Sequence, residues 1–238
     1  MNTEHLTSFM SFMKAVDIYD LLAHHVVFRG QAVSGNLLPG VARKAPALNT
    51  TDHEKNLLHQ LRLQGASMLP SYQESELDLL VRAQHFGLQT RLLDWTTNPL
   101  VALWFACNDY AAGDVYVYAL IADDLLVADL YASDPFELDV FETAKTRVFQ
   151  PRMNNARIVA QHGWFTLHRY SKKSSRFVPL EKNSEIRKHL TEYVIPASRR
   201  EEMLVSMDRL GVNAKSLFPD FEGMCRHLNW QYKSRMPT

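Results

Sequence analysis

Apolar residues recur at intervals of three and four along several stretches of the chain, which is the spacing that gathers them on one face of a helix. In the first half of the chain this pattern predicts helices over residues 4–23, 51–69, 75–87 and 98–113. Two of these helices have typical first residues: Thr51 with Glu54 has the form of a capping box, and Asn98 stands directly before Pro99. Helices therefore account for most of the chain before residue 114.

Short runs of β-branched and aromatic residues, between these helices and after them, predict strands. The runs cover residues 25–28, 114–121, 158–160, 164–167 and 192–195. Residues 88–97 follow neither the helical nor the strand period and are expected to be irregular, and residues 122–150 are ambiguous. Helices and strands together indicate a mixed α/β protein.

A polar run at residues 172–176 is the best candidate for a boundary within the chain. It predicts a core domain over residues 1–175 and a mainly helical extension over residues 176–238, packed on that core. Within the extension, Ser198 and Glu201 have capping-box spacing and predict a helix that follows them.

Composition narrows the classes of protein to which the chain can belong. Lys plus Arg equals Asp plus Glu, at 26 each, so no overall positive charge recruits nucleic acid, although a local basic groove stays open. Two cysteines are too few for a disulfide framework, and neither an 18-residue apolar run nor a signal-peptide pattern occurs. These features predict a cytoplasmic protein without a membrane span, and they leave the oligomeric state open.

Several widespread motifs are missing from the sequence. It has neither GxGxxG nor GxxxxGK followed by Ser or Thr, which argues against a Rossmann dinucleotide site and a P-loop. It also lacks GxSxG, which argues against an α/β-hydrolase. His162 and His168 do not have zinc-ligand spacing and the cysteines stand far apart, so no metal site is expected.

An unusual concentration of hydrogen-bonding side chains lies between two of the predicted helices. Within residues 82–99 these side chains are Gln84, His85, Thr90, Arg91, Asp94, Trp95, Thr96 and Asn98. Leu92 and Leu93 should hold the segment on the core, where Arg91 and Asp94 can form a charge-assisted pair. Such loops commonly carry binding or catalysis, with His85 here as a candidate general base. The alternative is a buried polar network that locks the junction, with His85 satisfied by carbonyls of the loop.

A second candidate segment is Phe28-Arg29-Gly30-Gln31, at the end of a predicted buried strand. Arginine at a strand end suits a phosphate or a carboxylate, and the glycine after it lets a ligand or another backbone come close. The alternative is a structural ion pair between Arg29 and an interior acid.

Together the two segments resemble the FRG-domain family, which is named after its Phe-Arg-Gly tripeptide, here Phe28-Arg29-Gly30. The second motif of the family resembles residues 83–106, in which AQHFG, TRLLDWT and NP follow one another. A third motif resembles Arg157 to Gln161 with Gly163 and Phe165, and a fourth resembles Ser216 to Asp220. The resemblance spans residues 26–224.

The layout of these motifs is similar to that of the ADP-ribosyltransferase superfamily. This resemblance implies an α+β fold, with a mixed, largely antiparallel sheet core and flanking helices, and it implies NAD as a co-substrate. It further implies that the cofactor is bound by Arg29, Gly30, Gln31, Arg91, Thr96 and Phe105, and that Arg29, His85, Asp94 and Gln161 act in catalysis.

The chain departs from that superfamily where a strand should supply a catalytic glutamate. Residues 157–165 contain Gln161 and no acid, so Asp94 is the candidate substitute. One hypothesis is therefore an NAD-dependent mono-ADP-ribosyltransferase, of the kind that serves as a toxin or an antiviral defence effector, with a protein or nucleic-acid acceptor. A second is a module that binds NAD, ADP-ribose or a nucleotide without turnover. A third is a nucleic-acid-processing enzyme with His85 as its base.

Overall fold

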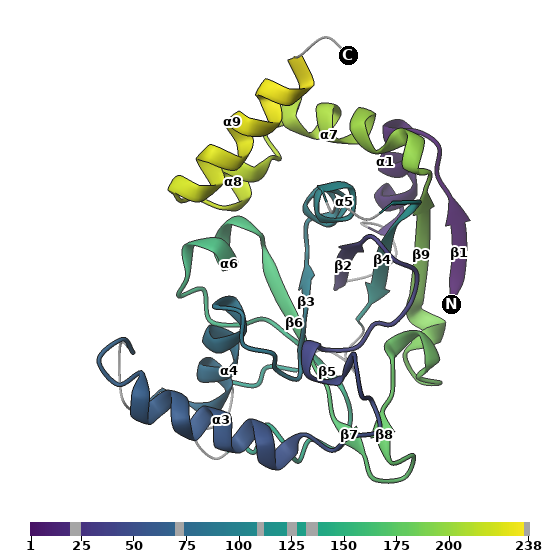
Figure 1. Cartoon of the computed structure of the whole chain (residues 1–238). Helices are drawn as coiled ribbons and strands as arrows, with labels where there is room; N and C mark the ends of the chain where they lie inside the picture. The colour runs from purple at the N-terminus through teal and green to yellow at the C-terminus, as the bar shows by residue number, and fades with distance from the viewer. Residues whose placement is uncertain (20–24, 70–73, 109–111, 123–127, 132–137, 236–238) are drawn as a thin grey trace.

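A single sheet of seven strands organises the fold in a computed structural model, which describes residues 1–19, 25–69, 74–108, 112–122, 128–131 and 138–235 (Figure 1). Its strand order is β1-β9-β4-β2-β3-β6-β5. The strands are β1 (Asn2–His5), β2 (Val26–Gln31), β3 (Leu92–Thr96), β4 (Val115–Ile121), β5 (Arg147–Phe149), β6 (Gly163–Leu167) and β9 (Leu190–Ile195). All neighbouring pairs are antiparallel except β1 with β9. The predicted α+β fold with a mixed, largely antiparallel sheet is thus confirmed, whereas its likeness to ADP-ribosyltransferases stays a prediction.

The helices gather in two groups around this sheet (Figure 1). Their bounds are α1 (Phe9–Asp17), α3 (Thr51–Gln64), α4 (Glu76–His85), α5 (Pro99–Asn108), α6 (Ala156–Ala160), α7 (Arg200–Arg209), α8 (Ala214–Leu217) and α9 (Phe221–Arg235). Side chains of α1, α5, α7 and α8 share one hydrophobic core with β2, β4 and β9. Side chains of α3, α4 and α6 share another with β3, β5 and β6. A small hairpin of β7 (Tyr170–Ser171) and β8 (Arg176–Phe177) stands apart from the main sheet.

The central contact of the first core is between α5 and β2. Gly30 makes it so close that a Cβ atom at this position would lie 1.7 Å from the backbone oxygen of Ala102 and 2.7 Å from the backbone nitrogen of Ala106. Only glycine, which has no side chain, lets the helix backbone come this near to a strand. The glycine thus fixes where α5 crosses the sheet.

The sheet separates into two parts at the junction of β2 and β3. Within the described residues these two strands share one register pair, Phe28 with Thr96. By contrast, β2 is paired with β4 from Val26 to Gln31, and β3 is paired with β6 from Leu92 to Thr96. The edges of β2 and β3 that follow the shared pair are therefore open, and Arg29 stands at the start of this opening.

Three predicted elements differ in the structure. The helix predicted over residues 4–23 is shorter: Asn2–His5 forms β1, which pairs in parallel with β9, and α1 covers only Phe9–Asp17. Residues 20–24 lie outside the described part. Residues 88–97 contain β3, whose side chains are buried on both faces except at Asp94, so no alternation is visible in the sequence. The β-branched run at 158–160 lies in helix α6, which begins after Asn155, whose side chain accepts a hydrogen bond from the Arg157 backbone nitrogen.

The predicted helix starts have mixed outcomes. Asn98 is confirmed, since its Oδ1 accepts a 2.9 Å hydrogen bond from the backbone nitrogen of Leu100 at the start of α5. The capping box predicted for Thr51 and Glu54 is wrong, because the Glu54 carboxylate turns inward and pairs with Arg91. The box predicted at Ser198 is also wrong: α7 begins at Arg200, after a short 3-10 turn and without a side-chain cap.

The segment beyond the predicted boundary contributes to the main sheet as well as to the helical layer. The boundary at residues 172–176 falls between β7 and β8, and β9 lies inside the sheet, between β1 and β4. Helix α7 packs against α5. The division into residues 1–175 and 176–238 itself stays a prediction. Among the described helices, none combines the length and the apolar character that crossing a membrane requires.

Candidate functional site

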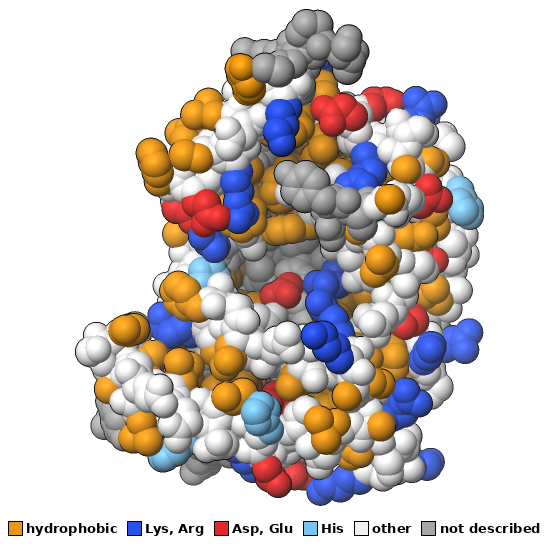
Figure 2. All heavy atoms as spheres, in the orientation of Figure 1, with side chains coloured by type: hydrophobic (Ala, Val, Ile, Leu, Met, Phe, Trp, Pro, Cys, Tyr) orange, Lys and Arg blue, Asp and Glu red, His pale blue; other side chains and the backbone are white. Residues whose placement is uncertain are grey.

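A cavity of about 340 Å³ lies beside the opening between β2 and β3. We call it the site cavity. Its walls come from β2, β3, the end of α4, α5, α6 and Phe218, so it joins elements that are far apart in the sequence. Figure 2 shows a deep hollow near the centre of one face of the molecule, with acidic and basic side chains inside it. Of the residues predicted for a site, the cavity brings together Arg29, Gly30, His85, Asp94, Thr96, Phe105 and Gln161.

Arg29 supplies the positive charge of the site cavity. Its Nη1 donates a 2.9 Å hydrogen bond to the backbone oxygen of Asp94, and its Nε donates one of 3.1 Å to Oε1 of Gln31. Burial lowers the pKa of Arg29 to about 10, against the nearby Asp94 carboxylate, which raises it. The guanidinium therefore remains charged at neutral pH. Within the described part of the chain, no hydrogen bond uses its Nη2.

Asp94 supplies the negative charge. Its Oδ1 accepts a 2.7 Å hydrogen bond from Nε2 of Gln84, and its Oδ2 lies 3.9 Å from Nη1 of Arg29. Gln84 is itself held by the hydroxyl of Thr90, which donates to its Oε1. The Asp94 side chain nevertheless stays 61% exposed. A carboxylate fixed on two sides and open on a third is available to a positively charged ligand atom.

Arg91 lies outside the site cavity, which corrects its predicted role in cofactor binding and its predicted pairing with Asp94. The two are three positions apart, an odd number, so their side chains point to opposite faces of the extended backbone. The fully buried guanidinium donates instead to both oxygens of Glu54, from Nη2 at 2.9 Å and Nε at 3.2 Å, and lies 4.3 Å from the Phe141 ring centre. The alternative that we left open, a buried polar network at this junction, describes Arg91 correctly.

His85 is the last residue of α4 and lines the site cavity. Its pKa is lowered, first by partial burial and then by the positive charges of Arg157 and Arg82. The imidazole is therefore neutral at pH 7 and has a free lone pair on one nitrogen. This is the protonation state that a general base requires.

Thr96 and Gln161 hold the wall of the cavity together. The Thr96 hydroxyl donates a 2.7 Å hydrogen bond to the backbone oxygen of Gln161 and accepts one of 3.0 Å from the backbone nitrogen of Asn98. The Gln161 side chain donates from Nε2 to the backbone oxygen of Leu217, at 3.1 Å. Both side chains thus connect β3, the end of α6 and α8, and Gln161 is the residue that follows α6 instead of part of the expected strand.

An aromatic wall closes one side of the cavity. Phe105 from α5 and Phe218, just after α8, meet edge to face with ring centres 6.1 Å apart. Arg157 lies over the Phe218 ring at 5.3 Å and forms a 2.6 Å ion pair with Asp220. Gln84, singled out in the sequence without a specific role, also lines the cavity. Arg157 and Phe218 were not predicted as site residues, although both belong to the motif segments quoted above.

Gln31 turns away from the cavity and supports Arg29 from behind. Its Nε2 donates to the backbone oxygens of Val33, at 2.9 Å, and Gly35, at 2.7 Å, while its Oε1 accepts from Arg29. Its place in the structure is therefore that of a residue that orients Arg29.

One acid in the sheet was not foreseen. Glu192 on β9 is in register with Tyr118 on β4, which is in register with Arg29 on β2, so all three side chains point to the same face. Glu192 is buried and accepts hydrogen bonds from hydroxyls of Tyr118, at 2.6 Å, Ser34, at 2.8 Å, and Thr3, at 3.3 Å. These donors occupy the carboxylate, and Glu192 does not line the site cavity.

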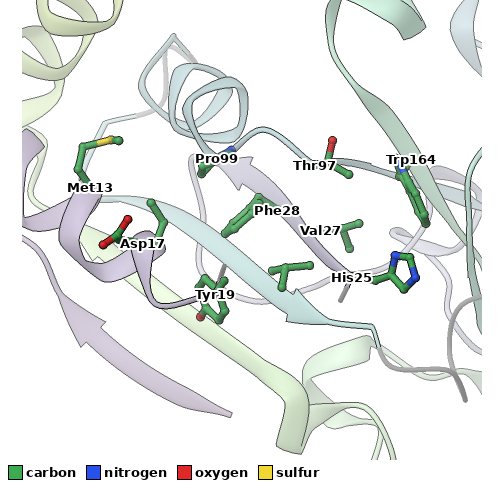
Figure 3. Close-up of a pocket in the computed structure, with 11 residues that line it drawn as sticks. Met13, Asp17, Tyr19, His25, Val27, Phe28, Thr97, Pro99 and Trp164 are labelled. Atoms are coloured by element: carbon green, nitrogen blue, oxygen red, sulfur yellow. The ribbon is translucent and has the colours of Figure 1, made fainter. Parts of the chain in front are cut away.

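A second cavity, of about 390 Å³, lies between α1, the start of β2 and β6 (Figure 3). Its lining is largely apolar and aromatic. Asp17 and His25, the lining residues that could act as acid or base near neutral pH, lie at opposite ends of this cavity (Figure 3). Trp164 lies beside His25, and Phe28 lies between Asp17 and His25 (Figure 3). Because these groups do not converge, the site cavity with Arg29 and Asp94 is the better candidate.

Comparison with known proteins gives one match. Residues 24–114 match the family model of the FRG domain. This range contains both segments that meet in the site cavity, whereas the cavity residues from α6 and Phe218 lie beyond it. No curated protein and no solved structure matches the chain.

Proposed function

We propose, from the premise that residues 24–114 form an FRG domain, that the chain is an NAD-dependent mono-ADP-ribosyltransferase with its active site in the site cavity. The observation that carries the proposal is the pairing of Arg29 and Asp94. A largely buried guanidinium and an exposed carboxylate lie 3.9 Å apart, in a cavity that also has an aromatic wall and a neutral histidine. The two charges suit the two charged parts of NAD: the anionic diphosphate and the cationic nicotinamide ring, whose positive charge passes toward the ribose as the bond between them breaks.

Arg29 is proposed to bind the diphosphate. A guanidinium that keeps its charge and has an unused Nη2 can offer planar donors to phosphate oxygens. Gln31 fixes the orientation of the side chain through Nε, which reduces the entropy lost when the ligand binds. Gly30 lets the backbone of α5 approach β2 directly beside Arg29, which sets the position of this wall of the cavity.

Asp94 is proposed to stabilise the charge that develops in the reaction. As the bond between ribose C1′ and the nicotinamide nitrogen breaks, its electron pair goes to the nicotinamide ring, and the ribose becomes cationic, as in glycoside hydrolysis. A preorganised carboxylate lowers the free energy of such a transition state. Gln84 and Arg29 already hold Asp94 in place, so the carboxylate does not need to reorient.

The acceptor then completes the transfer. Its nucleophilic atom bonds to C1′ and gives up a proton, for which neutral His85 is the proposed base. Phe105 and Phe218 form the wall against which we place the nicotinamide ring. Under this proposal Asp94 on β3 takes the place of the glutamate that the superfamily carries on a strand, while Gln161 supports the wall.

The decisive experiment measures both nicotinamide release and NAD binding. With the purified chain, NAD and a cell lysate as the source of acceptor, we expect nicotinamide release together with transfer of label from the adenylate half of NAD. Asp94→Asn should lower kcat by about 10²–10³ while the dissociation constant for NAD changes only a few-fold, because a charge that stabilises the transition state is lost. Asp52→Asn, which removes an exposed carboxylate on α3, is the matched control and should have no effect.

Other outcomes separate the hypotheses. Binding of NAD without nicotinamide release in the unaltered chain would contradict a transferase and favour a binding module. Absence of both binding and release would overturn the role of NAD altogether. An Asp94→Asn variant with full activity would leave NAD chemistry standing but remove Asp94 from it.

A further inference from the structure

Helix α9 carries apolar side chains on two opposite faces. The face turned to the protein consists of Gly223, His227 and Trp230; the face turned outward, which we call the outer face, consists of Phe221, Cys225, Leu228 and Tyr232. At about 100° per residue the two sets are roughly 160° apart. A surface helix normally has a single apolar face, which it buries. The outer face is therefore unexplained by the packing of one chain.

The inner face of α9 is firmly seated. Gly223 lies so close to the preceding segment that a Cβ atom there would be 2.0 Å from the backbone oxygen of Phe218. His227 stacks on Trp230 with ring centres 6.2 Å apart, and its Nε2 lies 3.7 Å from Asp208 of α7. Trp230 packs against the core that α5 and α7 share. The helix is thus fixed in rotation, and it presents the outer face to solvent.

The outer face is apolar and, apart from the half-buried Cys225, strongly exposed. Phe221 is 84% exposed, Tyr232 66% and Leu228 53%. Single exposed apolar residues are common, but a continuous stripe of them usually marks an interaction surface. Figure 2 shows hydrophobic side chains gathered at the upper left edge of the molecule, where Figure 1 places α9.

We propose that the outer face is a self-association surface, on which α9 of a second copy of the chain packs in antiparallel orientation. The spacing of four, three and four residues is that of a coiled-coil seam. It is symmetric about a point between Arg226 and His227, so a two-fold axis at that point sets Phe221 against Tyr232 of the other copy and Cys225 against Leu228. This inference does not depend on the proposed enzymatic function.

Charge favours a second copy in antiparallel orientation. The polar flank of α9 has Glu222 near its start and Lys233 near its end. Glu222 also forms an exposed ion pair of 2.5 Å with Arg226 of the same helix. In the antiparallel pair the two copies present this flank on the same side of the seam, so Glu222 of each copy lies near Lys233 of the other. In a parallel pair the two flanks would lie on opposite sides of the seam, and these charges would not meet. The antiparallel arrangement also sets opposite ends of the two helix dipoles side by side.

The size of the outer face predicts weak association. Aromatic side chains bury about 150–250 Å² each when fully covered, so the exposed parts of Phe221, Leu228 and Tyr232 in two copies amount to on the order of 800 Å². A stable interface typically buries about 1,600 Å² in total. We therefore expect a dimer that dissociates in the range of about 10–100 µM.

Sedimentation equilibrium of the full chain tests the association. Between about 5 and 300 µM the average mass should rise from that of a monomer toward that of a dimer. Leu228→Glu, which places a charge at the centre of the outer face, should raise the dissociation constant at least about tenfold. Asn229→Glu introduces the same charge at the next residue, which lies on the polar flank of α9, and should change the dissociation constant of the dimer less than about threefold.

Cys225 provides an independent test of the geometry. In the antiparallel pair the two Cys225 residues lie about 4.5 Å apart along the helices, whose axes are about 8–10 Å apart, so a bismaleimide with a reach of about 8–10 Å should join them. Cys107 cannot compete, because it is buried and burial raises the pKa of its thiol to about 12. Cys225→Ser should abolish the cross-linked dimer, and Leu228→Glu should reduce it.

Orientation is tested by exchange of charges. Glu222→Lys should weaken the dimer about twofold to fivefold, and Lys233→Glu in the same chain should restore it. A monomer at every concentration, or a dimer that Leu228→Glu leaves unchanged, would overturn the proposal. A dimer that the charge exchange does not restore would contradict the antiparallel orientation.

Discussion

Nη1 of Arg29 donates a hydrogen bond to the backbone oxygen of Asp94, 2.9 Å away, between residues that are 65 positions apart. The bond crosses the opening between β2 and β3, where the sheet is otherwise joined by the single pair of Phe28 and Thr96. Arg29 therefore connects the two parts of the sheet and also supplies the charge of the site cavity. Experiments on this residue have to separate a loss of binding from a loss of stability.

Arg29→Lys makes that separation. Lysine keeps the positive charge but has all its donors on one nitrogen, so it cannot reproduce the geometry in which separate guanidinium nitrogens bond Gln31, the Asp94 backbone and a phosphate. We expect the dissociation constant for NAD or ADP-ribose to rise at least about tenfold, measured by titration calorimetry, while the free energy of unfolding in urea falls by only about 1–2 kcal/mol.

The control for this prediction is Arg187→Lys, an equally conservative change at an exposed position. It should alter neither quantity. If Arg29→Lys bound NAD as well as the unaltered chain, Arg29 would be a purely structural residue, as in the ion-pair alternative that the sequence left open.

Gly30→Ala should be far more disruptive than its size suggests. The added methyl would lie 1.7 Å from the Ala102 backbone oxygen, so the backbone of α5 would have to move. Overpacking of a core by flexible side chains costs about 1–3 kcal/mol, and a backbone clash leaves less room to adjust, so we expect a loss of at least about 3 kcal/mol in urea unfolding.

Gly40→Ala serves as the matched control. A Cβ atom there would lie 3.5 Å from the Gln89 side chain, which is an ordinary contact. Its effect should stay within about 1 kcal/mol. Equal losses for the two variants would show that the tight crossing of α5 over β2 is not a determinant of stability.

The sequence predicted which segments meet better than it predicted how they meet. The Phe28-Arg29-Gly30 tripeptide and the stretch from Gln84 to Phe105 were singled out from residue types, and both line the site cavity. Gly30 was expected to permit a close approach by a ligand or by another backbone, and the backbone of α5 is in fact there. The contact of Arg29 with Asp94 was not foreseen, because no local period describes a pair 65 residues apart.

The errors have physical causes in the local sequence. Residues 92–96 were expected to be irregular because β3 is covered on both faces, so apolar residues follow one another without alternation. Residues 158–160 were expected to be a strand because Ile158 and Val159 are β-branched, but Asn155 caps a short helix there. Arg91 was paired with Asp94 for its proximity in sequence, whereas Glu54 reaches it from α3.

Glu54→Gln should strongly destabilise the fold without a direct effect on binding. It would leave the guanidinium of Arg91 buried without its anionic partner, and removing one partner of a buried ion pair costs about 3–5 kcal/mol. The double variant Glu54→Gln with Arg91→Met should lose less than the single variant, because no unpaired charge remains. Urea unfolding measures both.

An exposed ion pair provides the comparison for that prediction. Glu202 lies 2.9 Å from Arg199, and about half of each side chain is in solvent. Glu202→Gln should therefore cost no more than about 1 kcal/mol. If Glu54→Gln cost as little, the interior position of the Arg91 pair would be energetically unimportant, contrary to our account of this junction.

His168 should make the stability of the protein depend on pH. It is buried at the end of β6, where burial lowers its pKa to about 3, and the charges of Arg29 and Arg91 add to the effect. Its hydrogen-bond partners fit the neutral form: Trp95 Nε1 donates to the Thr166 hydroxyl, which leaves that hydroxyl free to donate to Nε2 of His168, 3.0 Å away.

The sign of the dependence follows from the two states of the chain. Above a pH of about 6.5 His168 is neutral both in the folded and in the unfolded chain, and it adds no pH dependence. As the pH falls below that value, only the unfolded chain takes up the proton, so the free energy of unfolding falls, by about 1.4 kcal/mol per pH unit at most.

Urea unfolding at pH 7.5, 6.5, 5.5 and 4.5 should show a loss of about 2–3 kcal/mol from this residue. His168→Gln should remove that part of the slope, whatever stability it costs at pH 7.5, whereas His53→Gln at an exposed position should keep it. An unchanged slope in His168→Gln would mean that other groups govern acid unfolding and that His168 titrates in the folded protein as it does in water.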